Sequence, residues 1–280
     1  MILIADSGTT KTDWCLVDAY GYPKYLETAG FNPYYMDSDT IRNILEKELT
    51  PLIDEKSIRE LYYYGSGCST DTKRLIVDNA LSDTFTEAHI EVEHDLLGAA
   101  RGLLGRDAGI ACILGTGSNS CYYDGQAISE NIPSLGYLYG DEGSGAYIGR
   151  KLLEAYLKNK LPEEINLAFT EKHELSLEQI LDATYNREKP NQFMASFVPF
   201  VAEHINNDFL RNLVRASFED FMQNQVFRYS RFRESAIHFS GSIAFIFKDI
   251  LERVLKEYDL KMGKVIKKPI EGLAGFHFPE

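Results

Sequence analysis

The chain opens with Ile2-Leu3-Ile4-Ala5-Asp6-Ser7-Gly8-Thr9-Thr10-Lys11-Thr12-Asp13-Trp14, and this stretch decides the fold. A short apolar run that ends at a carboxylate and a turn signal predicts a buried strand. Apolar residues alternate again from Asp13 to Asp18, so we predict a second strand and therefore a β-hairpin. The other motifs of the chain are compared with this hairpin.

The loop of the hairpin carries the groups that a nucleotide's phosphates need. Gly8 brings backbone N–H groups close, and Lys11 supplies a cation. The hydroxyl donors are Thr9, Thr10 and Thr12. At the end of the strand, Asp6 is a candidate Mg²⁺ ligand, because Mg²⁺ favours one carboxylate together with phosphate oxygens and waters. Glycine and threonine are also common in ordinary turns, so this loop alone leaves both interpretations open.

A second loop of the same kind lies near the middle of the chain. The buried strand predicted over 108–114 leads into Gly115-Thr116-Gly117-Ser118-Asn119-Ser120, and a further strand follows through Tyr123. Two hairpins with glycine and hydroxyl loops favour phosphate binding over turn chemistry. They also indicate two related lobes that hold one nucleotide.

Composition limits the classes of partner. The 280-residue chain has a net charge of −13 and 44% hydrophobic residues, which suits a globular protein and argues against a general nucleic-acid surface. No apolar run is long enough for a membrane helix, and the N-terminus lacks the pattern of a secretory signal. The four cysteines show no metal-binding spacing, so we expect free thiols, no zinc site and a cytoplasmic location.

Two aspartates stand where ligands are expected. Asp95 follows a strand predicted around Ile90 and Val92 and opens a helix, the position where α/β sheets place their ligands. It could cap that helix, or it could act as the general base of a phosphoryl transfer. Asp141 lies in Gly140-Asp141-Glu142-Gly143-Ser144, where a capped helix start is the alternative to a binding site.

Two further segments have open interpretations. Asn32 precedes a proline, as in many turns, but its amide could also bind a sugar hydroxyl. Gly241-Ser242 joins a late strand to a helix, and such a turn either faces a nucleotide or is an ordinary connection. The first ~105 residues predict a three-stranded meander and two strand–helix units, and 161–229 is predicted to be mostly helical.

This order of motifs resembles the N-acetylglucosamine kinase branch of the BadF/BadG/BcrA/BcrD ATPases, within the superfamily that includes actin, hexokinase and the heat-shock chaperone ATPases. The resemblance covers essentially the whole chain and is most specific at 115–119 and 140–144. It implies an α/β fold of two ribonuclease H-like lobes, each with a five-stranded mixed sheet and flanking helices, and an interlobe cleft. The lobes would be 1–117 and 118–280, with the extreme C-terminus packing back on the first.

The resemblance also implies roles for individual residues, with ATP and Mg²⁺ as cofactors. Asp95 would be the general base and Asp6 the Mg²⁺ contact through water. The residues matched to ATP binding are Gly8, Thr9, Thr10, Lys11, Thr12, Thr116, Gly117, Gly241 and Ser242. The residues matched to sugar binding are Asn32, Asp95, Ser118, Asn119, Ser134, Leu135, Gly136 and Asp141.

The expected reaction is phosphorylation of an amino sugar to its 6-phosphate. Ser134-Leu135-Gly136-Tyr137 stands where relatives carry a Gly-Gly-Trp-Gly type of run, so the sugar contacts differ there. N-acetylglucosamine is the favoured substrate, and glucosamine and N-acetylmuramic acid remain alternatives. The other hypotheses are an ATPase activator of a dehydratase or reductase and a non-catalytic sugar or nucleotide sensor. We expect no nucleic-acid or membrane partner, and a monomer and a homodimer are both compatible with the sequence.

Overall fold

The computed structural model describes residues 1–278 of the chain, which divides into two compact units. The first unit comprises residues 1–108, 123–128 and the segment from Lys268 onward. The second unit comprises 109–122 and 129–267. Each unit is built on one five-stranded sheet.

The sheet of the first unit has the strand order β3-β2-β1-β4-β5. Its strands are β1 (Ile2–Ser7), β2 (Lys11–Val17), β3 (Pro23–Ala29), β4 (Glu60–Gly65) and β5 (His89–His94). The first three form an antiparallel meander, while β1, β4 and β5 run parallel. The strands β1, β4 and β5 therefore end at the same edge of the sheet, where Ser7, Gly65 and His94 are in register.

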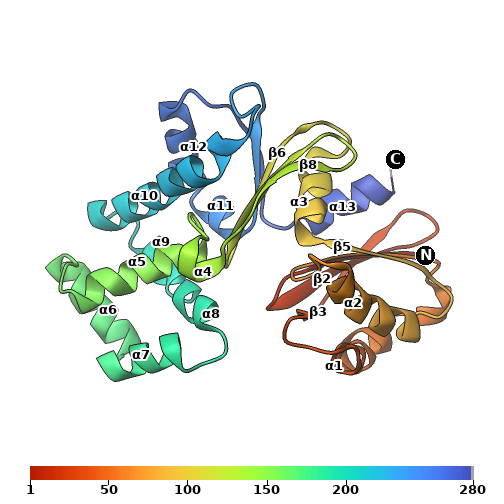
Figure 1. The fold of residues 1–280 in the computed structure, drawn as a ribbon. Helices are drawn as coiled ribbons and strands as arrows, with labels where there is room; N and C mark the ends of the chain where they lie inside the picture. The colour runs from red at the N-terminus through yellow and green to blue at the C-terminus, as the bar shows by residue number, and fades with distance from the viewer. Residues whose placement is uncertain (279–280) are drawn as a thin grey trace. The chain divides into compact units, whose positions relative to one another are not determined.

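Helices cover both faces of this sheet (Figure 1). They are α1 (Ser38–Ile44), which continues as a π-helix over Leu45–Leu49, α2 (Asp71–Thr84), α3 (Asp95–Leu104) and α13 (Ile270–His277). Trp14 and Leu16 of β2 are in the core that includes residues of α1 and α2. Cys15 and Val17 are in the core that includes residues of α3 and α13. Because side chains alternate along a strand, Lys11 and Asp13 lie on the α13 face.

The sheet of the second unit has the order β10-β9-β6-β7-β8. Its strands are β6 (Gly109–Leu114), β7 (Ser118–Tyr123), β8 (Ile128–Ile132), β9 (Ile237–Ser240) and β10 (Met262–Ile266). The strand β9 pairs in parallel with both β6 and β10. Leu114 at the end of β6 and Ser240 at the end of β9 therefore lie at one edge of the sheet.

One large core holds the second unit together. The helices are α4 (Gly136–Tyr139), α5 (Gly145–Leu157), α6 (Glu163–His173), α7 (Leu177–Tyr185), α8 (Pro190–Ala195), α9 (Val198–Glu203), α10 (Asp208–Asn224), α11 (Ser242–Ile246) and α12 (Lys248–Glu257). Ile110 and Cys112 of β6 pack in the same buried cluster as Phe218 and Phe221 of α10. These aromatic side chains of α10 are therefore part of the core of the second unit.

The predicted fold class is confirmed, and the differences are local. The strand β6 belongs to the second unit, not to a first lobe of residues 1–117, because it pairs with β9. The helix expected through Leu49 changes to a π-helix after Ile44. The sequence reasoning did not identify β8 or α4.

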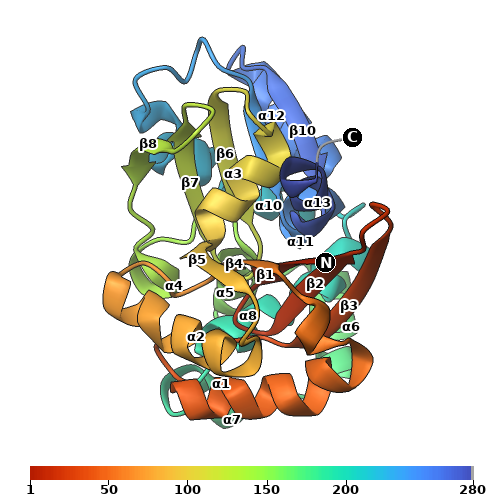
Figure 2. The same ribbon diagram turned by 90° about the vertical axis from the view of Figure 1, so that its right-hand side faces the viewer.

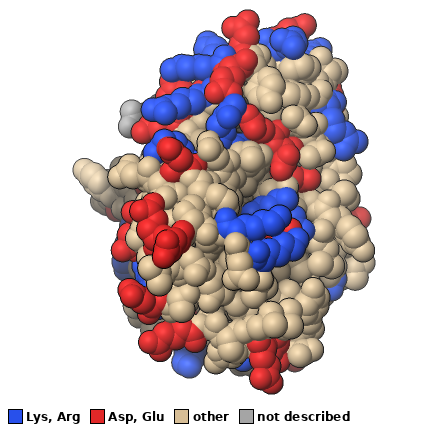
Figure 3. All heavy atoms as spheres, turned by 90° about the vertical axis from the view of Figure 1, so that its left-hand side faces the viewer, with Lys and Arg blue, Asp and Glu red and all other residues tan. Residues whose placement is uncertain are grey.

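The helices and one face of the surface bear on possible partners. No helix of the described residues is long and apolar enough to cross a membrane. On the face drawn in Figure 3, Lys and Arg side chains form one compact group near the centre, and others are mixed with Asp and Glu side chains toward the top.

The C-terminal helix α13 packs beside α3, as Figures 1 and 2 both show. The ring of His277 stacks on Tyr62, with their centroids 3.7 Å apart. Arg101 of α3 donates to the Tyr64 hydroxyl at 2.7 Å, and that hydroxyl lies 2.8 Å from Nε2 of His277. Burial, together with the positive charges of Arg101 and Arg106, lowers the pKa of His277 to about 4. The folded protein therefore holds this ring neutral, as an acceptor from Tyr64.

We expect this histidine to make the first unit sensitive to acid. Its pKa is lower in the folded than in the unfolded state, so its contribution to stability is complete above pH ~6.5 and is lost as the pH falls toward 4. The loss amounts to at most about 3 kcal/mol of unfolding free energy. Urea unfolding followed by the fluorescence of Trp14, the single tryptophan, measures this between pH 4 and 8.

The matched variant is His277→Gln, which keeps an acceptor for Tyr64 but cannot be protonated. It should lose part of the acid sensitivity and match the wild type most closely near pH 8. An unchanged dependence on pH between 4 and 6.5 would contradict the role given to His277.

Candidate active site

The loop between β1 and β2 is held by close backbone contacts. The N–H of Gly8 donates to the carbonyl of Lys11 at 2.9 Å, and the N–H of Gly30 donates to the carbonyl of Thr10 at 3.1 Å. A Cβ at Gly30 would lie 2.2 Å from the Gly8 carbonyl oxygen, so only glycine permits this approach. Gly8 and Thr10 are exposed. The loop therefore presents its backbone at the surface in a fixed shape.

Two other segments meet this loop. The Asn32 side-chain amide donates to the Thr9 hydroxyl at 3.2 Å, and that hydroxyl lies 3.4 Å from Oγ of Ser66, just after β4. The Oδ1 atom of Asn32 also accepts from the N–H of Tyr34, so the predicted turn is present as well. The structure thus brings together Asn32, predicted to bind sugar, and Thr9, predicted to bind phosphate.

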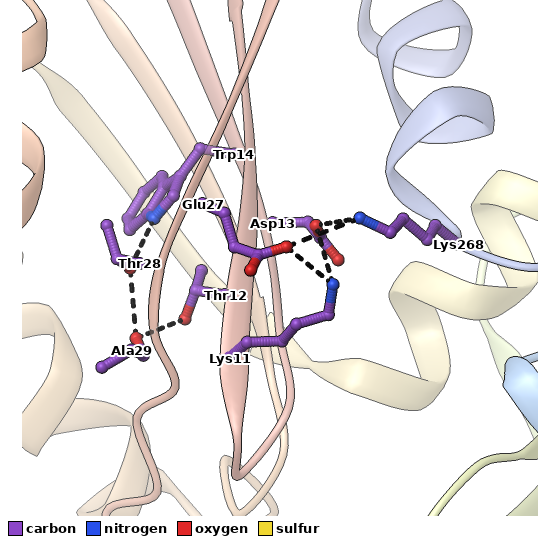
Figure 4. Close-up of polar contacts among 8 residues, drawn as sticks. All are labelled: Lys11, Thr12, Asp13, Trp14, Glu27, Thr28, Ala29 and Lys268. Carbon is purple, nitrogen blue, oxygen red and sulfur yellow. Dashed lines mark hydrogen bonds and ion pairs between the residues drawn. The ribbon is translucent and has the colours of Figure 1, made fainter. Parts of the chain in front are cut away.

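Thr12 has a different environment from its neighbours. Its hydroxyl is buried, 2.7 Å from Oγ of Ser7, and it donates to the Ala29 carbonyl at 3.3 Å. Figure 4 shows the contact with Ala29 inside the meander. The Thr12 side chain therefore ties the three strands together beneath the loop.

Asp6 and Asp95 lie at the edge where β1 and β5 end. Asp6 is in register with Tyr64 of β4, which is in register with Glu93 of β5, two residues before Asp95. Adjacent strands lie about 4.8 Å apart and a strand rises about 3.3 Å per residue, so the backbones of the two aspartates are separated by roughly 12 Å across β4. The edge of the parallel strands thus carries two carboxylates, as the sequence predicted.

Asp95 is not the cap of its helix. His94 takes that position, because its Nδ1 accepts from the N–H of Leu96 at 3.1 Å. The Oδ1 atom of Asp95 lies 2.9 Å from the same Nδ1, but it is buried and has no hydrogen bond among the described residues. Burial disfavours the charged ring, but the adjoining Asp95 raises the pKa of His94 above its usual value. The Asp95 side chain is partly exposed, and an ionised carboxylate has enough lone pairs to accept from a ligand hydroxyl as well as from a protonated Nδ1 of His94.

Two other carboxylates act on Asp6 through their negative charge. Burial raises the pKa of Asp6 to about 7, and the carboxylates of Asp95 and Asp13 add to this, while Lys11 and Lys268 act against it. A divalent cation would relieve the crowding of negative charge. No group of three or more metal-ligating side chains exists among residues 1–278, so a cation here would rely on Asp6, water and ligand oxygens. That donor set fits Mg²⁺.

Lys11 is engaged within the first unit. Its Nζ donates to Glu27 at 2.8 Å and lies 3.4 Å from Oδ1 of Asp13 (Figure 4). Burial acts against its charge, but the hydrogen bond to Glu27 and the charge of Asp13 raise its pKa. Lys11 is therefore a fixed positive charge beside the loop.

The second glycine loop, residues 115–117, is also held by close contacts. The N–H groups of Gly145 and Ala146 donate to the carbonyls of Gly115 and Thr116 at 2.8 and 3.0 Å, so the start of α5 supports the loop. Gly241 has φ of +110°, and a Cβ there would lie 2.3 Å from the Leu114 carbonyl oxygen. Gly241 and Ser242, which begins α11, therefore lie beside the end of β6.

Asp141 connects two of the predicted sugar segments. Its Oδ1 accepts from the N–H of Ser118 at 3.1 Å and from the Ser134 hydroxyl at 3.2 Å. Its backbone has φ of +55°, which is uncommon for a residue other than glycine, and the cap of α5 is Ser144 instead. Burial raises the pKa of Asp141, and these two hydrogen bonds partly offset the effect.

The remaining predicted residues of this unit are less tightly bound together. Asn119 accepts from the N–H of Ser120, and Leu135 is exposed. Gly136 has a positive φ, and a Cβ there would meet no other atom within 4 Å. The predicted site residues thus form two groups, one in each unit.

The comparisons with known proteins identify the family. No family model matches the chain. A solved structure of a Porphyromonas gingivalis protein, described as a candidate N-acetylglucosamine kinase, superposes with a TM-score of 0.95 and is 43% identical, over 99% of this chain and 98% of that one. The chain belongs to this N-acetylglucosamine kinase-like family.

Two more distant similarities are found, one to a curated sequence and one to a solved structure. A Dictyostelium discoideum N-acetyl-D-glucosamine kinase is 25% identical over 170 residues, and the chain spans about half the length of this curated relative, 53% of it. A Chromobacterium violaceum structure, also described as a candidate N-acetylglucosamine kinase, shares the fold with a TM-score of 0.72 at 16% identity. The resemblance predicted from the motifs to the N-acetylglucosamine kinases is confirmed.

The sequence reasoning missed three residues beside this kinase-like site. They are His94, Asp13 and Lys268. His94 immediately precedes Asp95, so its position next to the aspartate was a usable signal. Asp13 follows Lys11 by two residues, which places both on one face of β2. Lys268 gave no signal, because 255 residues separate it from Asp13.

Proposed function

We propose that the protein is an ATP-dependent kinase that phosphorylates an amino sugar, most favourably N-acetylglucosamine at its 6-hydroxyl. The observation that carries the proposal is the place of Asp95 at the end of β5, where its partly exposed carboxylate lies 2.9 Å from Nδ1 of His94 while His94, not Asp95, caps the helix. Family membership supports the same reaction class.

In the proposed reaction, Asp95 orients the sugar hydroxyl and accepts its proton. The hydroxyl oxygen forms the new bond to the γ-phosphorus, the bond from that phosphorus to the ADP oxygen breaks, and ADP leaves. Asp95 ends the step protonated and releases its proton to solvent. The location of Asp95 beside Asp6 and the 8–10 loop supports this assignment.

The remaining roles are assigned to the predicted site residues, one group of which lies in each unit. We assign the phosphates of ATP to Gly8, Thr9, Thr10 and Lys11 and to Thr116 and Gly117, and the nucleoside side to Gly241 and Ser242. The buried Thr12 supports the first loop from beneath. Bound at Asp6, Mg²⁺ would neutralise phosphate charge. We assign the sugar to Asn32, Asp95, Ser118, Asn119, Ser134, Leu135, Gly136 and Asp141. A cytoplasmic location stays a prediction.

The first experiment measures ADP release from Mg-ATP with single sugars. We expect strong stimulation by N-acetylglucosamine, and the panel also contains N-acetylmuramic acid, glucosamine, N-acetylmannosamine and glucose. The 6-deoxy analogue of N-acetylglucosamine is the matched control, because it lacks the proposed acceptor and should give no transfer. Phosphorus NMR of the product identifies the phosphorylated oxygen.

Two outcomes would contradict the proposal. Hydrolysis of ATP independent of sugar would favour an ATPase activator, and binding without turnover would favour a sensor. An activator of the iron–sulfur type needs cysteines that can reach a shared cluster. All four cysteines are buried and free, which favours the kinase over the activator.

A further inference from the structure

Three carboxylates stand in one row across the meander of the first unit. Asp6 of β1 is in register with Asp13 of β2, and Asp13 is in register with Glu27 of β3. Residues directly opposite one another share a face of the sheet, and like charges so placed repel each other. The row is therefore stable only with cations beside it.

Two lysines supply those cations (Figure 4). Lys268 donates to Oδ1 of Asp13 at 2.6 Å and lies 3.7 Å from Glu27. Lys11 contacts the same Oδ1 at 3.4 Å and Glu27 at 2.8 Å. Asp13 is 8% exposed, so its carboxylate depends on these ammonium groups much more than Glu27 does, which is exposed. Lys268 reaches it from the segment just before α13.

This arrangement conflicts with the role proposed for Lys11. A lysine that binds the phosphates of a nucleotide must turn away from Glu27 and Asp13. Glu27 can then be solvated by water, but Asp13 cannot, because it is buried. A buried carboxylate that loses its counter-ion is strongly unfavourable, so Asp13 would hold Lys11 back unless another cation stayed with it.

We propose that Lys268 is a positioning residue that keeps Asp13 neutralised while Lys11 turns from Glu27 and Asp13 to the phosphates of the nucleotide. Lys268 makes the shorter contact with Asp13, 2.6 Å against 3.4 Å, so it is the cation that remains. This inference rests on the proposed function, since it takes Lys11 as a phosphate ligand. Lys268 is distant in the sequence from every nucleotide motif, and the inference gives it a part in nucleotide binding.

Direct binding of Mg-ATP, measured by calorimetry, tests the inference. Replacing Lys268 with methionine should weaken binding by about tenfold or more, because a desolvated charge pair is lost when Lys11 moves. In steady-state assays the KM for ATP should rise, with the KM for the sugar nearly unchanged. The matched control is Lys267→Met, which removes the same charge from the exposed neighbour.

A second substitution separates positioning from direct phosphate contact. Asp13→Asn removes the charge that Lys268 serves, so adding it to Lys268→Met should restore most of the affinity. Adding Lys11→Met to that double variant should abolish the restoration. If Lys268 contacted the phosphates itself, Asp13→Asn would restore nothing, and the inference would be wrong.

The remaining outcomes are also decisive. Lys268→Met could lower the free energy of unfolding, measured by Trp14 fluorescence in urea, and leave the affinity for Mg-ATP unchanged. Lys268 would then be a purely structural residue, and this inference, but not the proposed function, would be wrong. Wild-type protein that binds no nucleotide would overturn both the proposed function and this inference. Wild-type binding with equal binding by Lys268→Met would leave the kinase proposal standing and remove only the role of Lys268.

Discussion

Asp95→Asn is expected to lower kcat by about 10²–10⁴-fold, the range of a lost general base. The amide keeps the size of the carboxylate and can still accept a hydrogen bond from the sugar, but it cannot take the proton. The KM values for ATP and sugar should stay within about threefold, since the lost interaction belongs to the transition state. Steady-state kinetics with the best sugar of the panel measures both quantities.

A matched control removes the same charge from the start of another helix of the unit. Asp71 is the first residue of α2 after its cap Thr70, just as Asp95 is the first residue of α3 after its cap His94. Each substitution loses a favourable charge at a helix N-terminus, worth about 0.3–1 kcal/mol. Asp71→Asn should therefore leave kcat unchanged, and normal turnover by Asp95→Asn would show that another group is the base.

The opening hairpin was predictable because its signals are local. The strands β1 and β2 follow from apolar alternation, and the loop between them follows from glycine and threonine. The position of Asp95 was predictable for a related reason, since a strand that hands over to a helix places its last residue at the ligand edge of a parallel sheet. Both conclusions need only a dozen neighbouring residues.

Cap identity and distant contacts were not predictable in this way. Asp is a common helix cap, so composition favoured Asp95 over His94, yet the ring nitrogen of His94 accepts from Leu96. The contact of Lys268 with Asp13 depends on where α13 packs, which no local pattern specifies. The contacts of Asp141 with Ser118 and Ser134 likewise join segments that no local pattern brings together.

The second large effect concerns Asp6, whose carboxylate destabilises the metal-free protein. Its pKa rises from an ordinary 3.8 to about 7 on folding. The folded state thus keeps a proton that the unfolded state releases near pH 4, so unfolding free energy is lost as the pH rises from 4 to 7. Above pH 7, Asp6→Asn should increase the unfolding free energy by on the order of 2–4 kcal/mol, because the amide is never charged.

The same substitution should remove the response to magnesium. In the wild type, Mg²⁺ at pH 8 should raise the unfolding free energy, since a cation that binds only the folded state stabilises it. Asp6→Asn should show no such increase and little turnover. Urea unfolding followed by Trp14 fluorescence, at pH 5 and pH 8 with and without Mg²⁺, measures the stability effects. Asp18→Asn is the control, because the Asp18 carboxylate accepts from the N–H groups of Tyr20 and Tyr22 in a turn.

These two results together would show why the carboxylate is present. A neutral side chain that makes the empty protein more stable but ends its response to Mg²⁺ means that Asp6 trades stability for cation binding. Equal stability of the two proteins at pH 8 would mean that neither burial nor the charges of Asp95 and Asp13 raise the pKa of Asp6. A retained magnesium effect in Asp6→Asn would place the cation elsewhere. The pairing of a stability gain with a functional loss is therefore the sign that distinguishes a cation ligand from an ordinary buried aspartate.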